Sequence, residues 1–205
     1  MTKNRIHQLI DRNHVRIPKV KDLFGATGRK FLQGLNLSGI DQKLLEDHLE
    51  LLDTLHERIR KTEAWIEKEL KDNPLIGVLN TLPGFGKILS ALATLEIDDI
   101  SRFRTPAKFA SYCGLIPSTF GSGGKIYHGD LIPTGNRWLR YIFIEASWSA
   151  LRSSPYCRGY FDRIKYRKGS NTAIVAVARR LSEIAYHCLK GERYYVEHPY
   201  IPYAR

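Results

Sequence analysis

The stretch PSTFGSGGK, residues 117–125, places a serine between two glycines and a lysine three residues later. The Ser122 hydroxyl is a group that enzymes use as a nucleophile, and Gly121 and Gly123 leave the backbone around it open to a substrate. Lys125 could neutralise the oxygens of a phosphate. A Gly-Ser turn without any chemistry is the commoner meaning of such a pattern. Both interpretations therefore stay open at this point.

Two well-known loop motifs do not fit this stretch. A P-loop requires the pattern GxxxxGK[ST], but Thr119 stands at its first glycine and Ile126 at its last position. The nucleophile elbow of hydrolases requires GxSxG, and Phe120 occupies its first glycine. Phosphoryl transfer remains possible, because a serine can attack a phosphodiester while cations stabilise the developing charge. The candidate cations are Lys125, Arg137 and Arg140.

The charge of the whole chain favours a polyanionic partner. The net charge is +11 over 205 residues, and the chain is basic at both ends. Residues 1–37 contribute +6, residues 38–74 contribute −4, and residues 75–205 contribute +9. A balance of this kind is typical of nucleic-acid-binding proteins. We expect the two basic parts to contact DNA or RNA.

A second candidate for nucleic-acid binding is the sequence TLPGFGKILSALA, which predicts two helices joined by a tight turn. Gly84 and Gly86 would let this turn approach another backbone closely. The free N–H groups that begin the second helix, together with Lys87, could bind a phosphate without reading the base sequence. This is the pattern of a helix-hairpin-helix element. An ordinary pair of helices with a glycine turn is the alternative.

The elements that would position these residues are predicted to be helical, with no strand run long enough for a large sheet. A single long helix is predicted over residues 38–74, where Leu45, Leu52, Ile59 and Ile66 recur every seven residues. Such a helix either packs in its own domain or pairs with another chain, and we favour homo-oligomerisation. Shorter helices follow, and residues 117–135 form a Gly-rich loop or short hairpin. The Trp138 and Trp148 side chains are predicted to lie in the core.

The predicted fold class is therefore all-α, with a long coiled-coil-type helix ahead of a compact helical domain. Residues 1–37 form a basic connecting segment without a core of its own. The helical domain spans residues 75–191, and residues 192–205 form a Tyr- and Pro-rich tail. No apolar run approaches the roughly 20 residues of a membrane span, and no signal peptide is evident. Three widely spaced cysteines predict neither a metal site nor a disulfide framework, so we expect a cytoplasmic protein.

The order of several short motifs resembles a known family. Over residues 75–190, the sequences LPGFG, DISRFRTPAKFASYCGLIPSTFGSGG and GNRWLR are similar to the C-terminal half of prokaryotic transposases of the insertion-sequence 110/116/902 class. The first 74 residues also resemble the segment that precedes this half. The likeness therefore extends over nearly the whole chain.

The resemblance implies an RNA-guided recombinase. Members of the family combine a RuvC-like domain with four acidic metal ligands, a coiled-coil segment, and a C-terminal domain with a catalytic serine. The family serine falls on Ser122, which would make this residue a nucleophile that attacks DNA. The implied partners are DNA and a structured guide RNA.

The sequence departs from the family pattern at two places. The chain is expected to lack the RuvC-like domain and therefore to hold no metal or other cofactor, and Mg²⁺ is expected only with that domain. Members also often carry a lysine where Pro133 stands, which removes one expected phosphate contact. Alone, the chain is expected to be inactive in transposition. The alternative function is a non-catalytic helix-hairpin-helix module that binds nucleic acid and dimerises.

Overall fold

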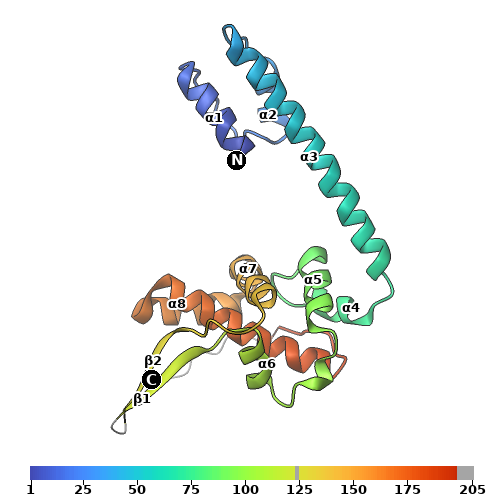
Figure 1. Cartoon of the computed structure of the whole chain (residues 1–205), viewed down its shortest axis with the longest axis vertical. Coiled ribbons are helices and arrows are strands. Elements are labelled where there is room, and N and C mark those ends of the chain that lie inside the picture. Colours follow the sequence, from blue (N-terminus) through green and yellow to red (C-terminus); the bar gives the residue numbers. More distant parts are fainter. Residues whose placement is uncertain (123–124, 198–205) are drawn as a thin grey trace. The chain divides into compact units, whose positions relative to one another are not determined.

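The computed structural model describes residues 1–122 and 125–197, with the backbone alone for Phe120, Ser122 and residues 125–128. The fold is mainly helical, as predicted from the sequence, and its only sheet within the described residues has two strands (Figure 1). The chain divides into two compact units, Met1–Trp65 and Ile66–Arg205. No helix in the described part of the chain is both long enough and apolar enough to cross a membrane.

The first unit has a hydrophobic core of its own. It contains α1 (Thr2–Arg12), α2 (Ala26–Gln33) and most of α3 (Ile40–Leu70). The core is built from both sides of the predicted boundary at residue 37, and its fully or nearly buried side chains include Ile6, Ile10, Leu32, Leu45, Leu49 and Leu52. Residues 1–37 thus share a core with α3, which supplies the apolar face that they lack alone.

Polar contacts hold α1 and α2 against α3. The Arg12 guanidinium forms an ion pair with Asp41, and the Asn13 amide donates a hydrogen bond to the same carboxylate at 2.7 Å. The Arg29 guanidinium pairs with Asp53 at 2.5 Å. The first unit is thus fixed by apolar burial on one side of α3 and by charge at its edges.

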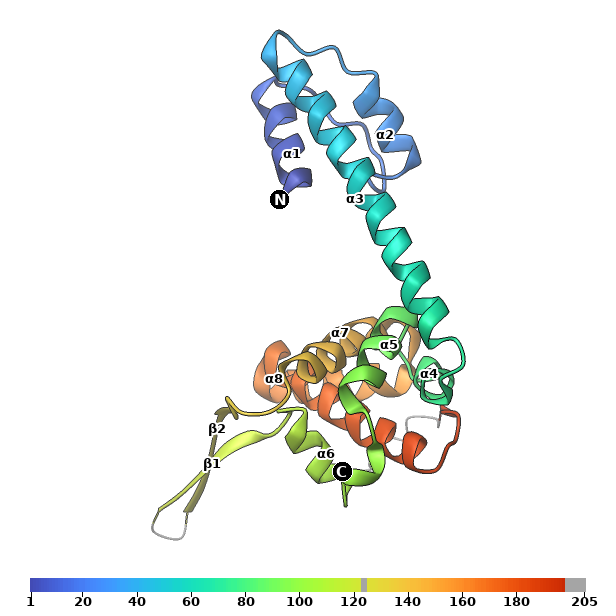
Figure 2. The same ribbon diagram turned by 45° about the vertical axis from the view of Figure 1, so that its right-hand side comes forward.

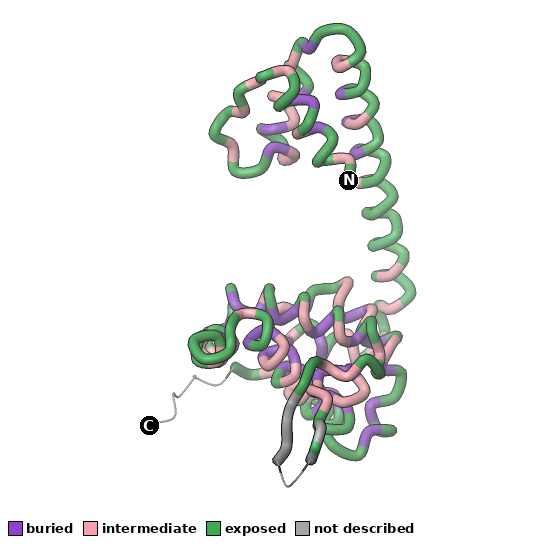
Figure 3. The backbone as a smooth tube through the Cα atoms, turned by 60° about the vertical axis from the view of Figure 1, so that its left-hand side comes forward, coloured by how far each residue is buried: buried purple, intermediate pink, exposed green. Residues whose placement is uncertain are grey.

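The helix α3 changes character along its length. Of the predicted heptad residues, Leu45 and Leu52 are buried in the core of the first unit, whereas Ile59 is 51% exposed. A second group of apolar residues on α3 lies in solvent, comprising Leu44, Leu51, Leu55 and Ile59, and we call it the α3 stripe. Figure 3 shows the green, exposed character of the later turns of this helix.

The second unit is a bundle of helices around a core that includes twenty buried side chains among the described residues. Its elements are α4 (Pro74–Asn80), α5 (Lys87–Ile97), a 3₁₀ turn (Ile100–Arg102), α6 (Pro106–Tyr112), α7 (Arg137–Ser153) and α8 (Pro155–Lys190). Phe109 and Phe143 are completely buried near its centre, with ring centroids 6.0 Å apart. Thr105 is the N-cap of α6, since its hydroxyl accepts a hydrogen bond from the Lys108 N–H at 3.2 Å.

The long helix α8 is interrupted at Gly169, which has a φ of +80°. The helix therefore consists of two segments, one on either side of this glycine. Residues before the break pack on the end of α7 in a small second cluster that includes Leu151, Cys157 and Phe161. The first residues after the break, Ala173, Ile174 and Val177, join the same small cluster, and the helix packs into the main core from Ala178 onward.

Between α6 and α7 the chain forms an antiparallel hairpin of β1 (Pro117–Ser122) and β2 (Lys125–Leu131). Phe120 pairs with Tyr127 and Ser122 with Lys125, and the register shifts between Pro117 and Thr119. Figures 1 and 2 both show this hairpin extending away from the helices of the second unit. Of the two sequence-based options, loop or short hairpin, the hairpin is correct.

Candidate catalytic hairpin and its root

The hairpin carries the candidate nucleophile at its far end. Ser122 is the last residue of β1, and the backbone of Lys125 at the start of β2 pairs with it. The side chains of Ser122 and Lys125, and the whole of Gly123, lie outside the described part of the structure. The structure thus brings Ser122 and Lys125 together as cross-strand neighbours by backbone register.

The base of the hairpin is held by Arg140, a residue that the sequence suggested as a phosphate ligand. Its Nη2 donates hydrogen bonds to the carbonyls of Ile132 at 2.8 Å and Thr134 at 3.1 Å. The Arg140 Nε is buried and has no hydrogen-bond partner among the described residues. Arg140 therefore anchors the chain that returns from the hairpin.

Two glycines make room for this arginine. Gly114 has a φ of +66°, and a Cβ atom there would lie 2.1 Å from Nη2 of Arg140. Gly135 has a φ of +110°, and a Cβ atom there would lie 2.9 Å from the Gly114 Cα. Only glycine fits such close approaches at positive φ. We call Gly114, Gly135, Asn136 and Arg140 the root cluster.

Asn136 makes hydrogen bonds that connect α5, α6 and α7 at the base of the hairpin. Its backbone N–H donates to the Tyr112 carbonyl at 2.7 Å, and its side-chain oxygen caps α7 by accepting from the Leu139 N–H at 2.9 Å. Its side-chain amide donates to Glu96 Oε2 at 2.6 Å. The Gly-Asn pair of the sequence thus fixes α5, α6 and α7 around the hairpin base.

Arg137, one residue after this cap, differs from Arg140. Its side chain is exposed, and it makes no hydrogen bond or ion pair within the described residues. Arg137 is therefore available to an anion, whereas Arg140 is engaged in the fold.

The turn between α4 and α5 contains two glycines with opposite surroundings. Gly84 has a φ of +80°, and a Cβ atom there would lie 1.9 Å from the Ala146 carbonyl oxygen of α7. A Cβ atom at Gly86 would meet nothing within 4 Å. The close approach that the sequence suggested for Gly84 is thus made inside the fold, and Gly86 alone faces open space.

Gly86 also begins α5, which has no side-chain cap at its N-terminus. The neighbouring Lys87 is exposed, and its Nζ forms an ion pair with Glu67 at 2.6 Å. A surface pair of this kind is weak, so a stronger anion could displace the carboxylate. Gly86 and Lys87 remain candidate phosphate contacts on this face.

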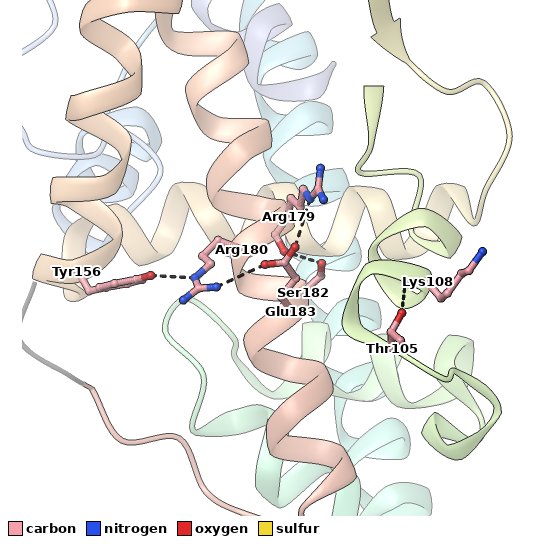
Figure 4. Close-up of polar contacts among 7 residues, drawn as sticks. All are labelled: Thr105, Lys108, Tyr156, Arg179, Arg180, Ser182 and Glu183. Atoms are coloured by element: carbon pink, nitrogen blue, oxygen red, sulfur yellow. Dashed lines mark hydrogen bonds and ion pairs between the residues drawn. The ribbon is translucent and has the colours of Figure 1, made fainter. Parts of the chain in front are cut away.

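Arg180 of α8 belongs to a different polar network, shown in Figure 4. Its Nε donates to the Tyr156 hydroxyl at 2.9 Å, and its Nη1 lies 3.5 Å from Glu183. The Tyr156 hydrogen bond raises the pKa of Arg180 above its usual value. Arg179 pairs with the same glutamate at 3.2 Å. Arg179 and Arg180 are therefore engaged in polar contacts on the helix surface, and they do not form a phosphate-binding site.

The described residues contain no group of three or more His, Cys, Asp or Glu side chains that could hold a metal ion. Burial raises the pKa of the Cys113 thiol, so this cysteine stays protonated and unreactive. The serine hairpin and the exposed cations near it therefore remain the candidate site of the second unit.

Sequence reasoning missed the exposure of Trp138 and Trp148. Both were predicted to lie in the core, but their side chains are 60% and 44% exposed, so this prediction was wrong. Both occupy the face of α7 opposite its buried residues. Their spacing relative to Leu139, Ile142 and Phe143 could have revealed this, because buried and exposed residues of a helix follow the 3.6-residue period.

Comparisons with known proteins cover the hairpin and its root. Residues 77–162 match the family model "Transposase IS116/IS110/IS902 family". A protein of insertion element IS110 from Streptomyces coelicolor is 34% identical over 146 residues, covering 70% of this chain and 36% of that protein. A probable family 20 transposase from Pseudomonas aeruginosa is 26% identical over 157 residues, covering 75% and 46%.

A third relative is the transposase for insertion sequence element IS1328 from Yersinia enterocolitica, 25% identical over 146 residues, covering 64% of this chain and 41% of that protein. The chain thus spans less than half the length of these curated relatives. Its matched region runs from α4 through the hairpin and the root cluster into α8. Residues 77–162 thus carry a transposase domain of the IS116/IS110/IS902 family.

Proposed function

We propose that this chain supplies the serine-bearing part of a DNA transposase, with Ser122 as the nucleophile. The observation that carries the proposal is the position of Ser122 at the end of a projecting hairpin, inside the region matched by the transposase family. A projecting ribbon can bring its end to a DNA backbone that the helical body cannot reach. The root cluster would fix the direction of that ribbon.

The proposed chemistry is a transfer of a phosphoryl group from a deoxyribose oxygen to the serine. The Ser122 oxygen would form a bond to phosphorus while its proton passes to a general base. The bond between phosphorus and the deoxyribose oxygen would break. The released oxygen would take up a proton, leaving a serine–DNA phosphodiester. Lys125 and Arg137 would stabilise the negative charge in this step. Gly86 and Lys87 would contact phosphates further along the DNA.

Other partners of the transposition reaction are proposed from the family resemblance. DNA would be bound by the basic second unit, together with a structured guide RNA. Mg²⁺ would be held by a RuvC-like domain rather than by this chain. Strand transfer with and without a separately supplied RuvC-like domain tests this division, because unaided strand transfer would contradict it.

We also propose that the chain forms a homo-oligomer through α3. The α3 stripe is exposed in the described structure, and its members recur near the helical period on one face. Apolar residues in such an arrangement are typical of helix pairing between chains. Sedimentation at several concentrations distinguishes a self-associating chain from a monomer.

The experiment that tests the nucleophile uses DNA substrates whose cleaved end cannot be religated. We expect a protein–DNA adduct that survives denaturation and disappears in Ser122→Ala. The matched control is Ser118→Ala on the same strand, whose hydroxyl donates to the Asp130 carbonyl at 2.9 Å. An adduct that persists in Ser122→Ala would overturn the proposal. A chain that binds DNA without any adduct, even when a RuvC-like domain is supplied, would be a non-catalytic binding module.

A further inference from the structure

One face of α7 carries a row of exposed aromatic side chains. Trp138, Tyr141 and Trp148 are 60%, 51% and 44% exposed. At 3.6 residues per turn these positions fall within an arc of about 80°. We call them the aromatic stripe. Tryptophan and tyrosine side chains are usually largely buried, so a row of them in solvent marks a binding surface.

Exposed cations continue this surface onto the first part of α8. The Trp148 ring lies edge-on to Phe161, with centroids 6.0 Å apart, and Lys165 Nζ lies 5.7 Å from the centre of the same Phe161 ring. The stripe and the helix before Gly169 are therefore in direct contact. The exposed cations near the end of this helix are Arg163, Lys165, Arg167 and Lys168, which we call the basic segment.

The basic segment is not neutralised by the fold. Between residues 155 and 168 the chain has five cations and a single acid, Asp162. Arg163 lies over the Tyr160 ring at 5.2 Å, and Arg167 and Lys168 make no ion pair within the part of the chain that the structure describes. Tyr166, in the middle of the segment, is 90% exposed. The charge is therefore free to attract a polyanion.

We infer that the aromatic stripe and the basic segment together bind single-stranded DNA. Unpaired bases would stack on the three aromatic rings, and the phosphates would lie along the basic segment. A duplex hides its base faces and could not use the stripe. This assignment rests on the proposed function only in taking DNA as the nucleic acid. None of its residues belongs to the candidate catalytic hairpin or the root cluster.

Glu145 lies within the arc of the stripe and supports this orientation of the strand. Its exposed carboxylate would repel phosphates from the stripe, so the bases rather than the backbone should face α7. The alternative occupant is another protein, since aromatic residues also gather in protein interfaces. The excess of unpaired cations beside the stripe favours a polyanion over a protein surface.

The test measures binding of a fluorescent 20-nucleotide oligo(dT) to the full chain by anisotropy. The double variant Trp138→Ala/Tyr141→Ala should weaken binding at least tenfold, because each stacked base contributes substantially to affinity. These two rings are more than half exposed, so their removal leaves the core intact. Trp65→Ala removes another exposed tryptophan, on α3, and should leave binding unchanged.

The basic segment is tested by salt dependence. Lys165→Gln/Arg167→Gln/Lys168→Gln should reduce the slope of log affinity against log salt by about 2, given about 0.7 per phosphate for single strands. The matched control is Lys43→Gln/Lys61→Gln/Lys71→Gln, which removes the same charge from exposed sites in the acidic part of the chain. It should keep the slope of the unmodified chain.

Three results would overturn the inference. Oligo(dT) binding within twofold of the unmodified chain in both variants would show that the surface is not used. An equal loss of blunt duplex binding in Trp138→Ala/Tyr141→Ala would show that the stripe does not select unpaired bases. Binding of oligo(rU) tenfold tighter than oligo(dT) would make the occupant RNA. The Ser122 adduct can succeed or fail independently of all three.

Discussion

At the scale of single residues, alanine substitutions at the two glycines of the α4–α5 turn should differ in how much stability they cost. Gly84→Ala places a Cβ atom against the Ala146 carbonyl at a positive φ, and should lower the free energy of unfolding by about 3 kcal/mol or more. Gly86→Ala meets open space, and should cost less than about 1 kcal/mol. Urea denaturation of both variants checks the difference. Equal losses would show that the turn is not packed on α7.

Of the two arginines near the start of α7, Arg140 should affect stability and Arg137 should affect DNA binding. Arg140→Ala leaves the Ile132 and Thr134 carbonyls without their donor, and should cost about 2–3 kcal/mol of unfolding free energy. Arg137→Ala removes an exposed and unpaired cation, so stability should change by less than about 0.5 kcal/mol. Its DNA affinity should fall several-fold at low salt. Thermal unfolding and anisotropy together test this pair, and a destabilised Arg137→Ala would contradict it.

Residue types predicted much of the candidate site, but not how each residue is used. Ser122, Lys125 and Arg137 remain predictions of chemistry, and the structure supplies their places on the hairpin and α7. The use of Arg140 could not be predicted, because its acceptors are backbone carbonyls whose position depends on the whole second unit.

At the scale of elements, α3 presents one face to its own chain and leaves another in solvent. If the α3 stripe pairs two chains, Leu55→Glu should shift the protein to the monomer, because it places a charge in an apolar contact. Thr54→Glu introduces the same charge at the position before Leu55 in the sequence. This position is exposed and lies outside the α3 stripe, so the substitution should leave assembly unchanged. Sedimentation velocity over a hundredfold concentration range measures both. Identical behaviour of the two variants would rule out this stripe as the interface.

The sequence predicted the extent of α3 well and its burial poorly. Its predicted range of 38–74 compares with Ile40–Leu70 in the structure, because apolar periodicity is a local signal. Which side of the helix is covered depends on how α1 and α2 pack against it, and the periodicity of α3 alone does not contain that information. The heptad pattern of Leu45 and Leu52 therefore marked an intramolecular core.

At the scale of the whole molecule, the two units have separate cores and should respond separately to core substitutions. Leu45→Ala should lower amide-exchange protection in the first unit by about 2–5 kcal/mol while the second unit keeps its protection. Ile40→Ala, at an exposed position of α3 outside the α3 stripe, should cost less than about 1 kcal/mol. Hydrogen exchange measured by peptide shows both effects, and a matching loss in α7 would indicate one cooperative molecule.

The close fit of Gly114 and Arg140 makes the mutational effects at the two positions interdependent. In Gly114→Ala the new methyl group would force the guanidinium away from its carbonyls, so much of the damage is the loss of Arg140 itself. In a chain that already carries Arg140→Ala, the stability provided by the Arg140 hydrogen bonds has already been lost. The double variant should therefore lose less stability than the two single losses combined, with only the strain of the positive φ remaining. Substitutions in this family domain that remove the arginine would thus relax the requirement for glycine across from it.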